Sequence, residues 1–61
     1  MPEVVVFAVE GRTAQQKKNL MKAITDAVAE HFIVDPAGVV VQIVEAPRDS
    51  KSKGGVPYSE R

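Results

Sequence analysis

The sequence predicts one α/β domain over residues 1–61, a β-α-β unit with two parallel strands. Two runs of β-branched and aromatic residues lie on either side of an amphipathic segment that opens with a helix-capping pattern. A crossover of this length, with a helix inside it, makes the two strands parallel. After residue 44 the composition changes to frequent Pro, Gly and Ser, which predicts a C-terminal loop or short hairpin around Gly54-Gly55.

Both predicted strands are apolar at almost every position. Residues 2–9 read P-E-V-V-V-F-A-V and residues 39–44 read V-V-V-Q-I-V. Such runs are typical of strands that are buried on both faces. One helix covers only one face of a two-stranded sheet, so the other face must meet a second copy of the chain. We therefore expect an obligate oligomer whose sheets pack back to back.

The predicted helix begins after Thr13 and is about 19 residues long. Thr13 and Gln16 have the spacing of a capping box, in which each side chain satisfies the backbone amide of the other residue. Asp35-Pro36 is expected to end the helix, because the residue before a proline disfavours helical geometry. The apolar stripe recurs at spacings of three and four, at Leu20, Ile24, Ala27, Val28 and Phe32.

Composition excludes several classes of protein. Eight basic and eight acidic residues cancel, so no overall field favours nucleic acid. The chain has no apolar stretch of 18 residues, so no membrane span is predicted. The N-terminus also lacks a signal-peptide pattern, so a cytoplasmic protein is expected. There is no cysteine and only one histidine, His31, which we expect to be partly buried on the flank of the helix. No metal site or cofactor is therefore expected.

Pro2 is the residue with the most unusual chemical potential. Removal of Met1 would leave a free secondary amine at the start of a strand. In a buried site beside cations the pKa of such an amine falls, and the amine can then serve as a general base or as a nucleophile. The alternative is purely structural, because proline suits the first position of a strand.

A resemblance to a known family rests on motifs along nearly the whole chain. These are Pro2, Glu10-Gly11-Arg12-Thr13, Gln16-Lys17, the strand 39–45 and Gly54-Gly55, and together they resemble the 4-oxalocrotonate tautomerase family. The resemblance implies a β-α-β protomer that forms hexamers and a cofactor-free keto-enol tautomerase. It implies that Pro2 moves a proton within a small enol or dienol acid of the 2-hydroxymuconate type, as in aromatic compound degradation. Arg12 would hold the substrate carboxylate, a role that suits a guanidinium.

Two positions depart from the family pattern. Val40 stands where the archetype has a second arginine, and Lys51 stands where it has an aromatic residue. Lys51 is therefore a candidate substrate-binding residue that could replace the missing charge, with Arg48 and Lys53 as alternatives in the same basic run. A solvated loop is the plain reading of that run.

Other interpretations stay open from sequence alone. Tyr58 either lines the pocket or packs between subunits, and packing is the favoured reading. Related proline-dependent chemistry, namely dehalogenation by hydration or decarboxylation, would need a carboxylate that activates water, for which Glu10 and Glu45 are available. A non-catalytic oligomeric binding protein is the third reading, and retention of Met1 would favour it because Pro2 would then be an amide.

Overall fold

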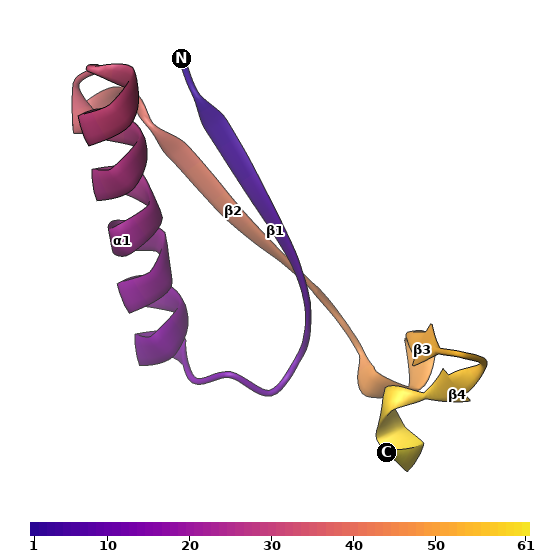
Figure 1. The fold of residues 1–61 in the computed structure, drawn as a ribbon. Helices are drawn as coiled ribbons and strands as arrows, with labels where there is room; N and C mark the ends of the chain where they lie inside the picture. Colours follow the sequence, from indigo (N-terminus) through magenta and orange to yellow (C-terminus); the bar gives the residue numbers. More distant parts are fainter.

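The computed structural model describes residues 1–61 and confirms the β-α-β unit (Figure 1). Strand β1 (Glu3–Val9) is followed by helix α1 (Ala14–Phe32) and strand β2 (Val40–Ala46). A hairpin of two short strands, β3 (Ser52–Lys53) and β4 (Val56–Pro57), completes the chain. Short 3₁₀ helices lie at Pro36–Gly38, Arg48–Ser50 and Tyr58–Glu60.

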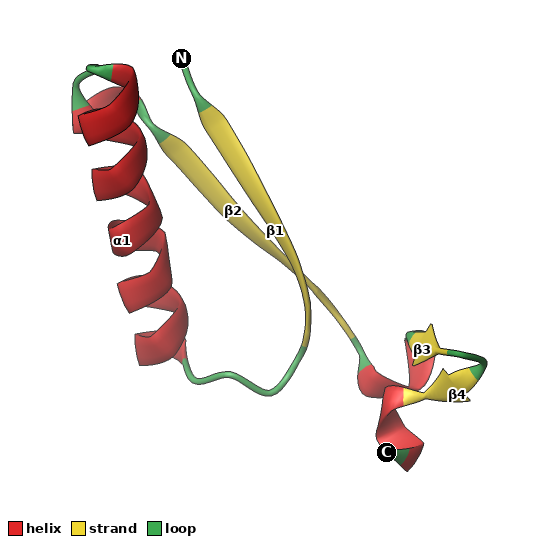
Figure 2. Ribbon diagram, viewed as in Figure 1, coloured by secondary structure: helices red, strands yellow, loops and turns green.

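Strands β1 and β2 form a two-stranded parallel sheet, and α1 lies along one of its faces (Figure 2). The register runs from Glu3 opposite Val40 to Val9 opposite Ala46. Along β1 the side chains alternate between half-buried and exposed, as the period of a strand requires. Because the two strands are parallel, their carboxyl ends lie at the same end of the sheet.

The face of the sheet away from α1 is apolar and exposed. Phe7 is 72% exposed and Val5 is 43% exposed in β1, and Val40 and Val44 of β2 lie on the same face. No residue of the isolated chain is fully buried, and its accessible surface is 4666 Å². A compact monomer of this mass has roughly 3,900 Å². Within a single chain the sheet face toward α1 is thus half-buried and the other face is exposed, so neither face is fully buried as expected for the assembly.

Helix α1 has both halves of the predicted capping box. The Thr13 hydroxyl accepts from the Gln16 amide at 3.1 Å, and the Gln16 side chain accepts from the Thr13 amide at 3.0 Å. The helix has the expected 19 residues, but Asp35-Pro36 does not end it. It ends at Phe32, because Ile33 adopts the left-handed conformation at φ 54. The expectation of a partly buried His31 is wrong for the isolated chain, where 75% of its side chain is exposed.

The C-terminal tail confirms the short hairpin and projects beyond the end of the sheet (Figure 1). Gly54 and Gly55 form its two-residue turn with φ values of 63 and 84, which glycine adopts without strain. The chain spans 42 Å along its longest axis, and its radius of gyration of 14.4 Å exceeds the roughly 10.5 Å of a compact domain of this length. Neither α1 nor any shorter helix combines the length and the apolar character that crossing a lipid bilayer requires.

Candidate active site

Pro2 is held at the start of β1 by its carbonyl group. The Val40 amide donates to the Pro2 carbonyl oxygen at 3.0 Å, which adds one rung to the ladder between β1 and β2. The proline ring is half-buried, and its nitrogen takes no part in the ladder because proline has no amide hydrogen. Met1, which precedes it, is 93% exposed. Met1 is therefore not packed against the rest of the single chain.

Arg12 lies at the opposite end of β1. The seven residues of the strand rise about 3.3 Å each and so separate Pro2 from the turn before α1 by about 23 Å. Figure 1 shows the N-terminus beside the last turn of α1 and the turn that carries Arg12 beside the first. Within one chain these two residues cannot act on the same small molecule.

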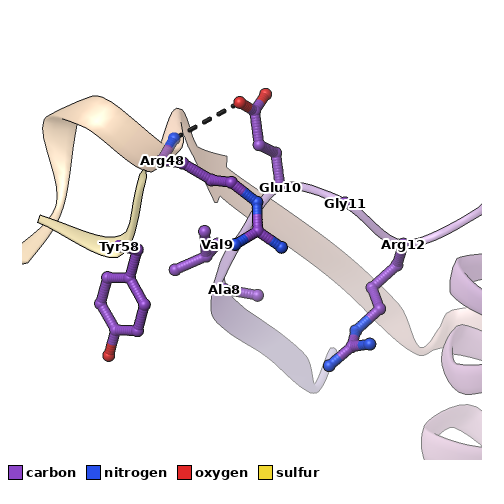
Figure 3. Close-up of a pocket in the computed structure, with 7 residues that line it drawn as sticks. All are labelled: Ala8, Val9, Glu10, Gly11, Arg12, Arg48 and Tyr58. Carbon is purple, nitrogen blue, oxygen red and sulfur yellow. Dashed lines mark hydrogen bonds between the residues drawn. The ribbon is translucent and has the colours of Figure 1, made fainter. Parts of the chain in front are cut away.

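A cavity of about 300 Å³ lies at the carboxyl end of the sheet (Figure 3). Two arginines from different loops line it, together with part of β1, the Glu10-Gly11 turn and one aromatic ring. Its lining residues are Ala8, Val9, Glu10, Gly11, Arg12, Arg48 and Tyr58.

One hydrogen bond ties Arg48 to this cavity, and its side chain passes close to the turn after β1. The Glu10 carboxylate accepts from the Arg48 backbone amide at 3.3 Å, which links the loop after β2 to the turn after β1. The Arg48 guanidinium then passes close to Gly11, since a Cβ there would lie 3.1 Å from Nη2. Gly11 has a φ of 128, so both the backbone geometry and the close approach favour glycine.

Neither guanidinium in the cavity is engaged in an ion pair. The ion pairs of the chain lie elsewhere, with Lys17 to Glu45 at 2.8 Å, Lys22 to Asp26 at 3.0 Å and Glu30 near His31 at 3.9 Å. Glu10 is the one carboxylate that lines the cavity. The two arginines therefore keep free donors that are suited to an anionic ligand.

The other predicted site residues are more scattered. Lys51 is half-buried and does not line this cavity, although its carbonyl oxygen accepts from the Tyr58 amide at 2.9 Å. Lys53 is exposed in β3, and Val40 lies beside Pro2 at the other end of the sheet. Tyr58 lines the cavity, and the Arg61 guanidinium lies 5.7 Å from the centre of its ring.

Sequence reasoning did not single out the pairing of Arg12 with Arg48. The signal was present, because parallel strands bring their carboxyl ends to one edge and Arg12 and Arg48 each follow such an end closely. No three His, Asp or Glu side chains come together in a way that could hold a metal ion.

The chain is similar over its whole length to proteins of one family. The family profile described as "Tautomerase enzyme" matches residues 2–61. A probable tautomerase of Bradyrhizobium diazoefficiens is 48% identical over 61 residues, which are 100% of this chain and 91% of that protein. The 2-hydroxymuconate tautomerase of Bacillus subtilis is 38% identical over 60 residues, covering 98% of this chain and 97% of that protein.

A solved structure agrees. The heterohexamer 4-oxalocrotonate tautomerase from Chloroflexus aurantiacus superposes with a TM-score of 0.90 at 33% identity, covering 98% of this chain and 97% of that chain. The predicted resemblance is thus confirmed in both sequence and fold. The chain belongs to the 4-oxalocrotonate tautomerase family, a family of isomerases.

Proposed function

We propose that the chain is a cofactor-independent tautomerase acting on a small enol or dienol 2-oxo acid of the 2-hydroxymuconate type. The observation that carries the proposal is the position of Pro2. Its carbonyl oxygen is fixed by Val40 while its nitrogen is left out of the sheet. Removal of the exposed Met1 would turn that nitrogen into a secondary amine whose place is set by the strand.

The site would form between protomers. Strand β1 puts about 23 Å between Pro2 and the turn that carries Arg12, so a site that uses both must take them from different chains. The exposed apolar face of the sheet, which includes Phe7, supports self-association through that face. We favour a hexamer, and the heterohexamer from Chloroflexus aurantiacus supports that number.

In the proposed reaction Pro2 is both base and acid. Its neutral amine takes the proton from the enol hydroxyl, and the resulting ammonium returns a proton to a carbon of the conjugated acid. Arg12 of a neighbouring protomer binds the substrate carboxylate and, as a nearby cation, lowers the pKa of the Pro2 amine. Lys51 stays a candidate for stabilising the charge that develops on the oxygen. A cytoplasmic enzyme of aromatic compound degradation remains our prediction for its setting.

The test begins with the mass of the native protein. An intact mass lacking Met1 is expected, and a retained Met1 would rule out Pro2 as the base. Turnover of 2-hydroxymuconate and phenylenolpyruvate is then followed by absorbance for the wild type and for Pro2→Ala. We expect Pro2→Ala to lose at least about 100-fold in kcat, the contribution of a positioned general base. Equal rates for the two proteins would remove Pro2 from the mechanism.

One observation keeps hydration-type chemistry as the second candidate. The Glu10 carboxylate lines the same cavity as Arg12, where it could activate a water molecule. Release of halide from 3-haloacrylates would favour this reaction. Failure of every enol acid and haloacrylate, with the oligomer intact, would favour a binding protein without activity.

A further inference from the structure

We infer that Glu45 is a positioning residue of the site, which occupies the Lys17 ammonium so that the substrate carboxylate binds to Arg12 in the productive cavity. The inference rests on the proposed function, because it takes Arg12 as the residue that binds the carboxylate. It gives Lys17 and Glu45 a role in binding that the proposed function does not itself require.

Arg12 belongs to two cavities. One is the cavity of Figure 3 at the carboxyl end of the sheet, here called the sheet-end cavity. The other, here called the helix-start cavity, has a volume of about 250 Å³ and is lined by Arg12, Gln16, Lys17 and Leu20. That volume equals about eight water molecules in the liquid, so a small carboxylic acid fits. An acid attracted by Arg12 can therefore enter either cavity.

Glu45 occupies the ammonium group that lines the helix-start cavity. Its Oε1 atom lies 2.8 Å from Lys17 Nζ, the distance of a charged hydrogen bond. The two side chains are 31% and 28% exposed, against 76% and 60% for the pair of Lys22 and Asp26 within α1. Partial burial lowers the effective dielectric around the first pair and weakens its screening by salt, so the charge of Lys17 is cancelled locally.

The fold places this pair beside the turn that carries Arg12. Glu45 stands opposite Ala8 in the register of the sheet, and Ala8 lines the sheet-end cavity. The Glu10 amide donates to the Ala46 carbonyl oxygen at 3.0 Å, so the turn that leads to Arg12 is attached to the same end of β2. Glu45 therefore reaches Lys17 where the two cavities meet at Arg12.

Without Glu45 the helix-start cavity would hold two free cations. Arg12 has no ion-pair partner, and an unpaired Lys17 ammonium would add a second positive charge to the same cavity. A carboxylate bound there would be withdrawn from the sheet-end cavity and would not react. Glu45 thus removes a competing anion site.

Binding of sorbate to a set of charge-removing variants tests the inference. Sorbate has one carboxylate and no 2-hydroxyl group, so it binds without reacting. In titration calorimetry Glu45→Gln should bind sorbate about tenfold more tightly than the wild type, the scale of one charged hydrogen bond to the freed ammonium. Lys17→Gln leaves the Glu45 carboxylate unpaired and should weaken binding several-fold. The double variant lacks both charges and should return to within about twofold of the wild type.

Asp26→Asn is the matched control. It also frees a lysine ammonium, that of Lys22, and changes the net charge by the same amount, but neither residue lines a cavity with Arg12. Its sorbate affinity should stay within about twofold of the wild type. A gain equal to that of Glu45→Gln would overturn the inference, because overall charge would then account for both. Circular dichroism and sedimentation would show that each variant is folded and assembled.

Turnover of phenylenolpyruvate gives a second readout. Substrate held in the helix-start cavity does not react, so KM and kcat of Glu45→Gln should both fall about tenfold while kcat/KM stays within about twofold of the wild type. A pair that only fastens α1 to β2 would lower the melting temperature of both single variants without this kinetic pattern.

Two further results would overturn the inference. One is a change of sorbate affinity in the same direction in both single variants, as a purely structural tie would give, and the other is a Glu45→Gln variant with the affinity of the wild type. Should Glu45→Gln fail to assemble, Lys17→Gln decides, because unchanged or tighter sorbate binding there would contradict the inference. A wild type that turns over no enol acid would refute the proposed function, while the sorbate series would still test Glu45.

Discussion

Replacing Phe7 with alanine should separate the protomers. Phe7 is 72% exposed on the sheet face that α1 leaves open. A phenylalanine presents about 200 Å², so association can remove about 140 Å² of its surface from water. At about 25 cal/mol per Å² that burial stabilises the contact by about 3.5 kcal/mol, and the Phe7→Ala variant would lose about 3 kcal/mol of this. A two-fold contact contains the residue twice, so the dissociation constant should rise about 10⁴-fold.

Sedimentation velocity over a range of protein concentrations measures this effect. The wild type is expected to stay assembled at low micromolar concentration, while Phe7→Ala dissociates and unfolds at lower temperature. Glu30→Ala is the matched control, because its side chain is 78% exposed on α1 and carries no apolar ring. Assembly of Phe7→Ala at the same concentrations as Glu30→Ala would show that the open sheet face is not the contact between chains.

Three other substitutions test separate features. Thr13→Ala removes one half of the capping box at the start of α1 and should lower the free energy of unfolding by about 1 kcal/mol, measured by urea denaturation. An unchanged denaturation midpoint would show that the cap does not stabilise the protein. Ile33→Asn should stabilise the protein by several tenths of a kcal/mol up to about 1 kcal/mol, because asparagine tolerates the left-handed conformation at φ 54. A lower melting temperature would instead mean that the 89% exposed Ile33 side chain packs in the assembly. Val40→Arg places a cation beside Pro2 and should raise kcat for 2-hydroxymuconate about tenfold; a decrease with the oligomer intact would show that this position now needs an apolar residue.

Local patterns predicted the β-α-β unit well, because each element carries its own signal. The capping box of Thr13 and Gln16 and the glycine pair at the hairpin turn are chemical requirements that can be identified from residue type and spacing alone. The helix end was predicted less well. Ile33 adopts a conformation that a β-branched residue rarely takes, so no residue preference pointed to it before Pro36.

The site was predictable only in part, because it depends on contacts between distant segments. Family motifs pointed to Pro2 and Arg12, whose roles remain predictions. Within the basic run the sequence favoured Lys51, with Arg48 and Lys53 as alternatives. The hydrogen bond from the Arg48 amide to Glu10 distinguishes Arg48 from the other two, and it joins residues 38 positions apart. Such a contact needs the parallel sheet to exist first, so composition and spacing could not reveal it.

The distance along β1 between Pro2 and Arg12 has a consequence for mixtures of damaged chains. In the proposed assembly each site takes Pro2 from one protomer and Arg12 from another. A Pro2→Ala protomer therefore removes the base from one site, and an Arg12→Gln protomer removes the carboxylate-binding arginine from a different site. When Pro2→Ala and Arg12→Gln chains are unfolded together and reassembled, roughly a quarter of the sites in random hybrids would combine two sound halves. Mixing two inactive variants would thereby restore part of the activity. If each site were instead contained within a single chain, every mixture would stay inactive.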